Sequence, residues 1–485
     1  LAMLFEEDAT IRKMAAWIDS PRDQGHGAAL PPIARRSASP EAPASWSQLR
    51  IWIGDQIQPG TALYNICRAV RLDGPLDCLA LERALDALVR RHEILRTVFT
   101  FDGALKQRIL PEAPSLQTDD LRNLPATERN SKTQELIQAE ANRGFDLNQG
   151  PLFRARLLLL GPEENVLLVT FHQIVVDGWS IPIFYRELAE LYEAAAEGRD
   201  SRLPDLPIQY ADFASWQQQW MTDAHLAEQF NYWRAHPARN QTELQFSRLH
   251  QPADVDTAPV GRTGQTVQVL RLDQPLVEAL REFNSREGNT LFVTLLTAFQ
   301  FLLHRWSGGE EIVVGSPAAG RTRLETEGLI GFFVNTLLLR TQIPRGGTFR
   351  DLSRQVRQTA SGAFAHSEAP FERVIQRHAR SSGAPQRWFQ FWFAPIDPQI
   401  PFVLGKVKAT PQIVFPNGAQ FDLSLFISES PGELLCYFEY QPGVLKEHQV
   451  ARFVTEYEAL LRQAIVKPGL PIAPESGAGV MAPLH

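Results

Sequence analysis

Cysteine is scarce in this sequence. The 485 residues include only three cysteines, Cys67, Cys78 and Cys436, and none belongs to a CxxC or Cys/His ligand pattern. Three widely spaced thiols exclude a disulfide framework and form no zinc motif. We therefore expect a reducing, cytoplasmic environment and no bound metal.

A basic excess and a long apolar run are also lacking. The net charge is -7, which argues against a surface that binds nucleic acid. The longest apolar stretch, residues 291–303, is interrupted by Thr294, Thr297 and Gln300 and is too short to span a bilayer. The first ten residues carry acidic side chains where a signal peptide would carry basic ones. We expect neither nucleic acid nor membrane among the partners.

The composition that remains is ordinary for a globular protein. Hydrophobic residues make up 44% of the chain, enough for a sizeable core. Residues 21–44 are rich in proline, glycine, serine and alanine without apolar periodicity, which predicts a linker, and residues 468–485 predict a tail or second linker. Residues 1–20 have a weakly helical spacing. The body between these segments is predicted to form two lobes, 45–220 and 221–467.

The periodicity of the body predicts an α/β (α+β) fold. Asp77 can cap a helix whose apolar residues recur at helical spacing through position 88. Residues 152–160 and 166–171 are predicted to be adjacent strands, the second buried on both faces, followed by a helix over 181–192. The second half repeats this order: strand 266–272, helices 276–283 and 291–306, and strand 311–315.

A cluster of polar residues follows the second of these strands. The segment 171–180 reads FHQIVVDGWS and places His172, Gln173, Asp177 and Gly178 between a strand and a helix. Loop side chains and backbone N–H groups can converge on a substrate at such a position. Taken alone, the segment more often represents a hydrogen-bonded core histidine followed by a turn.

Five further motifs change that interpretation. They occur at residues 45–52 (SWSQLRIW), 91–99 (RHEILRTVF), 210–216 (YADFASW), 330–336 (IGFFVNT), and 366 with 370–372 (His, then PFE). Together with the HHxxxDG-like segment 171–180, they resemble the motifs of condensation domains in nonribosomal peptide assembly lines. The six motifs occur in the order expected for that family.

The resemblance implies a V-shaped pseudo-dimer of two chloramphenicol-acetyltransferase-like lobes with a central tunnel. Two phosphopantetheine arms would enter it, one carrying an acyl or peptidyl donor and the other an aminoacyl acceptor, and an amide bond would form between them. No permanently bound cofactor is implied. The partners would be an upstream donor carrier, a downstream acceptor carrier and an adjacent adenylation domain. Residues 1–20 would then be the last helix of the upstream carrier, and the excised domain would be a monomer.

The resemblance also assigns roles to residues. His172, Gln173, Asp177 and Gly178 would form the catalytic group, with His172 orienting its neighbours. Asp177 would form a structural ion pair with Arg321. The Gly178 N–H could support a developing oxyanion. A substrate channel is predicted to include Trp179, Ser180, Arg96 and Asn335, although Arg96 could instead cap its own helix.

The main departure from the family pattern is Gln173. It stands where the family has its second histidine, and an amide cannot take a proton at neutral pH. Two alternatives to an active condensation domain therefore remain. One is a non-catalytic member that docks carriers or recruits a partner. The other is an O-acyltransferase that uses coenzyme A or a free alcohol.

Overall fold

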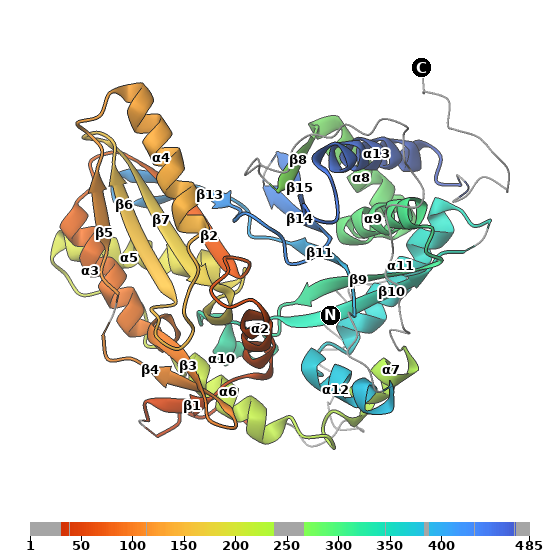
Figure 1. Cartoon of the computed structure of the whole chain (residues 1–485), viewed down its shortest axis with the longest axis horizontal. Coiled ribbons are helices and arrows are strands. Elements are labelled where there is room, and N and C mark those ends of the chain that lie inside the picture. Colours follow the sequence, from red (N-terminus) through yellow and green to blue (C-terminus); the bar gives the residue numbers. More distant parts are fainter. Residues whose placement is uncertain are drawn as a thin grey trace.

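The protein forms two lobes that lie side by side (Figure 1). The computed structural model describes residues 31–37, 39–112, 114–236, 266–344, 346–382, 388–430, 432–469 and 471. The segment predicted as a carrier helix, the start of the predicted linker and nearly all of the predicted tail lie outside these residues. In the described part, no helix is both long and apolar enough to cross a membrane.

The first lobe is built on a six-stranded mixed sheet. Its strand order is β12-β13-β2-β7-β6-β5. The strands are β2 (Asn65–Asp73), β5 (Gln117–Asp120), β6 (Phe153–Leu159), β7 (Glu164–His172), β12 (Phe402–Leu404) and β13 (Val407–Val414). Its helices are α3 (Cys78–Arg91), α4 (Ala126–Ala141) and α5 (Ser180–Glu197).

Helices cover both faces of this first sheet. Val70 and Leu72 of β2 belong to the main core together with residues of α3 and α5, whereas Cys67 and Ala69 pack in a smaller cluster with α4. Side chains alternate between the faces of a strand, so a strand covered on both sides needs a continuous apolar run. The prediction that β7 is buried on both faces is confirmed, because eight consecutive residues of it are buried. Asp77 caps α3 as predicted, accepting hydrogen bonds from the N–H groups of Leu79 and Ala80.

The second lobe repeats the arrangement with different connections. Its six-stranded sheet has the order β10-β9-β11-β14-β15-β8. The strands are β8 (Val267–Leu272), β9 (Glu311–Ala318), β10 (Asn335–Gln342), β11 (Phe391–Pro395), β14 (Leu423–Ser430) and β15 (Glu433–Tyr440). The helices are α8 (Gln274–Glu287), α9 (Leu291–Ser307), α11 (Phe349–Ala365) and α13 (Glu447–Val466).

Helix α9 is the apolar stretch that the sequence analysis singled out. Every residue of it from position 293 to 303 is buried. The interrupting polar side chains donate internally: Thr294 to Asn284, Thr297 to the carbonyl of Val293, and Gln300 to the carbonyl of Leu339. Such partners lower the cost of burying these donors in a core helix, whereas the Gln300 Oε1 atom has no partner among the described residues.

A segment of the chain beyond residue 221 forms part of the first lobe, which the predicted boundary between the lobes did not anticipate. Strands β12 and β13 lie in the predicted second lobe by sequence, yet β13 pairs antiparallel with β2 of the first lobe along its length. The chain therefore leaves the second sheet after β11 and returns to it at β14. Apolar alternation identifies a strand but not the sheet edge to which it adds, so the sequence pattern could not reveal this crossover.

Shorter elements lie around the junction between the lobes. They are β1 (Glu41–Pro43), β3 (Thr97–Phe101), β4 (Leu105–Ile109), α2 (Trp46–Ile57), α6 (Tyr210–Trp220), α7 (Ala227–Ala235), α10 (Leu324–Glu327), α12 (Phe371–Ser382), and the 3-10 turns η2 (Glu93–Arg96) and η3 (Gln173–Val175). Strands β1, β4 and β3 form a separate three-stranded sheet.

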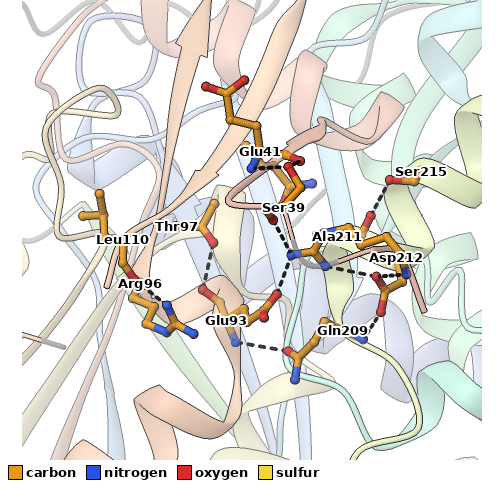
Figure 2. Close-up of polar contacts among 12 residues, drawn as sticks. Ser39, Glu41, Glu93, Arg96, Thr97, Leu110, Gln209, Ala211, Asp212 and Ser215 are labelled. Atoms are coloured by element: carbon orange, nitrogen blue, oxygen red, sulfur yellow. Dashed lines mark hydrogen bonds and ion pairs between the residues drawn. The ribbon is translucent and has the colours of Figure 1, made fainter. Parts of the chain in front are cut away.

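The predicted linker 21–44 is packed where the structure describes it. Strand β1 pairs with β4 and the Ile33 side chain is buried. The Arg36 guanidinium lies 2.8 Å from a Glu93 carboxylate oxygen and 3.0 Å from one of Asp212. Figure 2 shows Glu93 and Asp212 in the polar network of this region. The linker interpretation is therefore wrong for the described residues between 31 and 44. Proline and serine suit an extended edge strand as well as a free chain, so composition did not distinguish the two.

This packing predicts a stability effect for Arg36. Replacing it with alanine leaves the buried Asp212 carboxylate without its cation, so we expect Arg36→Ala to lower the free energy of unfolding by about 2 kcal/mol. Arg90 pairs with Asp86 on an exposed helix surface, and Arg90→Ala should cost less than about 0.5 kcal/mol. Urea denaturation of both variants measures the difference. Equal losses would mean that the segment contributes no more than a surface contact.

Candidate functional site

The segment between β7 and α5 is held in shape by the His172 side chain. The 3-10 turn η3 begins directly after His172, whose Nδ1 accepts a hydrogen bond from the Ile174 N–H at 3.2 Å. This contact places the imidazole proton on Nε2, which lies 3.8 Å from a carboxylate oxygen of Asp55. The ring is fully buried, and burial lowers the pKa of His172 below its usual value. His172 is therefore neutral and acts on the loop through its backbone contact.

Asp177 and Arg321 join the two lobes. Arg321 Nη2 lies 3.0 Å from Asp177 Oδ1, and both side chains are almost completely buried. The carboxylate also accepts hydrogen bonds from the N–H and hydroxyl of Ser180 and from the N–H of Phe333. Arg321 in turn donates to the carbonyl of Leu329. The predicted contact is present, and the carboxylate is saturated with donors from both lobes.

The backbone before Arg321 explains how the guanidinium reaches this position. Gly320 has a φ of 67°, and a Cβ there would lie 2.0 Å from the carbonyl oxygen of Phe333. Only glycine fits such a turn without displacing the facing backbone of Phe333, just before β10. The Arg321 guanidinium then stacks over the Phe333 ring at 4.0 Å from its centroid.

Other motif residues make contacts across the same junction. Arg50 of α2 forms an ion pair with Glu372 of α12 at 3.0 Å. The Tyr210 hydroxyl donates to the carbonyl of Phe332 at 2.6 Å and lies 2.8 Å from the hydroxyl of Ser45. These contacts connect motifs that are more than 100 residues apart in the sequence.

A cavity of about 870 Å³ lies between the two sheets. Its volume falls within the range of pockets that bury small-molecule ligands. The first lobe contributes the start of β2, the end of β13 and the first turns of α5. The second lobe contributes residues of β11, β14 and the end of β15. The charged or polar residues that line it are Arg50, Asn65, Arg68, Gln173, Asp177, Arg186, Glu327, Asp397, Gln420 and Glu439.

Gly178 and Trp179 face this cavity. Gly178 is exposed and a Cβ there would meet no atom within 4 Å, so the protein's own packing does not require glycine. A side chain at position 178 would instead occupy cavity space. Trp179 is 52% exposed, and its indole N–H donates to the carbonyl of Glu327 at 3.3 Å across the lobe junction.

Comparisons with known proteins agree with this geometry. The model of the family described as "Condensation domain" matches residues 38–476. A linear gramicidin synthase protein of Brevibacillus parabrevis is 38% identical over 95% of this chain, and phosphinothricin tripeptide synthetase PhsC of Streptomyces viridochromogenes is 38% identical over 89% of it. The chain spans 9% and 40% of the lengths of these two relatives.

The chain belongs to the condensation domain family of nonribosomal peptide synthetases. Solved structures share its fold. A starter condensation domain of rhizomide synthetase is 24% identical with a TM-score of 0.76, covering 89% of this chain and 96% of that one. The X-domain of teicoplanin biosynthesis, in its complex with OxyB, is 25% identical with a TM-score of 0.75, covering 92% and 98%.

Gln173, the departure from the condensation domain motif, lines the cavity. Its side-chain oxygen accepts a hydrogen bond from the Gln420 amide at 3.2 Å, and the same Gln420 amide donates to the carbonyl of Leu63 at 2.7 Å. Gln420 lies on the returning crossover between β13 and β14. This contact occupies one acceptor position of the Gln173 oxygen, and the Gln173 NH₂ group donates to no acceptor among the described residues.

Three residues predicted for the substrate channel lie elsewhere. Ser180 is fully buried behind Asp177. Arg96 donates to the carbonyl of Leu110, as Figure 2 shows, and is not among the residues that line the cavity. The Asn335 amide donates to the carbonyls of Ser367 and Ala369 and positions the start of α12. These three residues belong to or adjoin motif segments in the sequence, but their side chains point into the packed junction between the lobes and not into the cavity.

Most residues of the cavity wall were not predicted from the sequence. Arg68 and Asp397 form a buried ion pair at 2.5 Å between β2 and the outgoing crossover. Trp392 and Phe421 stack with ring centroids 5.2 Å apart. Glu439 stands in β15 between two aromatic residues, which was the one available signal for a buried acid. The other residues come together only through the crossover that the sequence pattern did not reveal.

The pair Asp177–Arg321 predicts a large effect on stability. We expect Arg321→Ala to lower the free energy of unfolding by about 3–5 kcal/mol, because a buried carboxylate loses its cation. The control is Arg271→Ala, which breaks an exposed pair with Glu433 in the same lobe and should cost less than about 1 kcal/mol. Thermal and urea unfolding measure both. A loss for Arg321→Ala no greater than for the control would contradict the structural role of the pair.

Proposed function

We propose that this chain forms an amide bond between an acyl or peptidyl donor and an aminoacyl acceptor, each carried as a thioester on the phosphopantetheine arm of a carrier protein. The acceptor amine attacks the donor's carbonyl carbon, the new C–N bond forms, the donor's C–S bond breaks, and the amine proton leaves with the released thiol. The observation that carries the proposal is the cavity that both lobes line, with Gly178 exposed and Gln173 half-buried in its wall.

Positioning is the main contribution that this cavity can make. Holding an amine and a thioester in attack geometry replaces a collision between two carrier-bound groups by an intramolecular step. The effect can be worth several kcal/mol of barrier. The upstream and downstream carriers are the partners that deliver the two arms, and the product is a longer nonribosomal peptide.

The N-terminus of α5 supports negative charge at the reacting carbonyl. The helix begins at Ser180, directly after Gly178 and Trp179, so its positive dipole end lies at the cavity wall. In the described part of the chain, the Gly178 N–H donates to no protein acceptor. It is therefore free to donate to the oxygen of the donor carbonyl as charge develops there.

Gln173 can orient the substrates but cannot remove a proton. The residue lines the cavity, its oxygen is held by Gln420, and its NH₂ group can donate a hydrogen bond. An α-amine has a pKa near 8, so a fraction of the acceptor is already neutral near pH 7.5. The proposed activity of this chain is consequently slow and depends on the neutral fraction of the acceptor.

A second candidate function is carrier docking or partner recruitment without bond formation. Gln173 favours it, because the family's second histidine is absent. The similar X-domain of teicoplanin biosynthesis forms a complex with OxyB, so this fold can serve as a platform for another protein. The intact environment of Gly178 favours the catalytic proposal instead.

The two proposals differ in what Gln173→His should do. We expect amide formation by the parent chain to be slow and to increase as pH passes about 8, and Gln173→His to increase it about 10²-fold or more by supplying a base. Gln173→Ala, which removes both the orientation and the contact with Gln420, is the matched control and should fall below the parent. The assay uses loaded upstream and downstream carriers and mass spectrometry of the product.

Carrier binding is measured in parallel. If both carriers bind while all three proteins form no amide, the catalytic proposal fails and the docking function becomes the better account. An unchanged rate in Gln173→His would show that a base at position 173 is not limiting.

A further inference from the structure

One wall of the cavity carries an acid that the proposed reaction does not use. In the second sheet, Trp392 of β11 is in register with Ser424 of β14, and Ser424 is in register with Glu439 of β15. Residues in register across a sheet point to the same face. Trp392 and Glu439 both line the cavity, and the small Ser424 lies between them. Two interstrand spacings, about 10 Å, separate their backbones, and Ser424 is fully buried between them, so a ligand reaches the two side chains from the cavity.

Glu439 differs from the other buried acids of this cavity. Asp177 is paired with Arg321 and Asp397 with Arg68. No cation pairs with Glu439 among the described residues, and its residue is only 7% exposed. Burial raises the pKa of this carboxyl to about 8, with the Ser424 hydroxyl opposing the shift. At neutral pH the group is mostly an uncharged acid.

The described residues around Glu439 provide no counter-ion for it. From β14 it is faced by Ser424 and from β8 by Val267, which is in register with it. Across the cavity lie the ion pair of Arg68 and Asp397 and the exposed Arg186. Arg68 is occupied by its own carboxylate, and Arg271 further along β8 is paired with Glu433.

We propose that Glu439 and Trp392 form a subsite for a protonated amine on the side chain of a substrate residue. The inference rests on the proposed function for the presence of substrates in the cavity, and it names their class: a residue with a basic side chain, brought either as the acceptor or as the last residue of the donor. An ammonium group that approaches from the cavity pairs with the Glu439 carboxylate and lies against the Trp392 ring.

Physical chemistry favours this occupant over an apolar one. A buried carboxyl is uncharged because its anion lacks a partner, and a cation at ion-pair distance reverses that preference. Aromatic rings attract ammonium groups through their faces, most strongly in the case of tryptophan. An apolar side chain would instead leave the carboxyl without any hydrogen-bond partner from the ligand.

The proposal predicts proton release on binding. At pH 7 a carboxyl with a pKa of about 8 carries about 0.9 proton, which it must lose to pair with a cation. The probes are stable amide analogues of lysyl and norleucyl thioesters on N-acetylethylenediamine. Each is made with a free α-amine to mimic the acceptor and with an acetylated one to mimic the donor. Calorimetry in buffers of different ionisation enthalpy measures the released protons and the affinity together.

We expect one lysyl probe, the acceptor or the donor form, to bind at least about tenfold more tightly than its norleucyl partner and to release close to one proton more. Glu439→Gln should abolish both differences. Glu327→Gln, which changes an exposed acid lining the same cavity, should preserve them and is the matched control. Equal affinity and equal proton release for the lysyl and norleucyl probes would overturn the proposal. So would proton release by the free-amine norleucyl probe alone, which would place the α-ammonium at Glu439.

The pH dependence of stability in the absence of ligand provides a separate check on Glu439→Gln. The folded-state pKa of Glu439 lies above the ordinary value of 4.5, so its contribution to stability is present below pH 4.5 and is lost as pH rises through about 8. Glu439→Gln should remain folded and lose less stability over that range. Because these readouts concern binding and folding, their outcome is independent of whether the chain forms amide bonds.

Discussion

The buried carboxylate of Asp177 is the contact on which the rest of the site depends. It receives donors from the first lobe through Ser180 and from the second lobe through Arg321 and Phe333. A buried charge is tolerated only when it is paired and hydrogen-bonded, so neither lobe can move away without exposing an unsatisfied ion. The same contacts fix the start of α5 and the entry to β10. The cavity wall around Gly178 therefore takes its shape from an ion pair whose carboxylate is already saturated by protein donors.

The motif residues serve this junction more than they serve chemistry. Arg50 pairs with Glu372, Tyr210 binds the carbonyl of Phe332, and His92 accepts from the N–H of Ile330 while it contacts Glu187. Each of these contacts is buried or nearly so. A set of motifs spread over 300 residues thus describes one packed interface, which explains why these members are polar although their contacts are with the protein itself.

Features that depend on interactions between residues close in the sequence could be predicted, and features that depend on distant residues could not. Helices α3 and α5 and strands β6 and β7 were predictable because periodicity and capping are local. The contact of Asp177 with Arg321 was predictable only through the family resemblance. Other features depend on tertiary contacts that no local pattern encodes. They are the position of β13 beside β2, of the Ser180 side chain behind Asp177, and of Arg36 against Asp212. The cavity wall around Trp392 and Glu439 was missed for the same reason, since its residues are brought opposite the first lobe by the crossover.

The geometry of the motif also limits how the proposed reaction can handle its proton. His172 is buried and makes its contact with the loop backbone, the Asp177 carboxylate is saturated, Gln173 is an amide, and Gly178 has no side chain. None of these four residues can accept a proton inside the cavity. The attacking nitrogen must therefore lose its proton before attack, to solvent, or afterwards, to the departing sulfur. A thiol has a pKa near 8.5 and an α-amine one near 8, so a leaving thiolate is basic enough to take the proton from the nitrogen that displaces it. Under the proposed function, the leaving group would supply the basicity that the protein lacks at position 173.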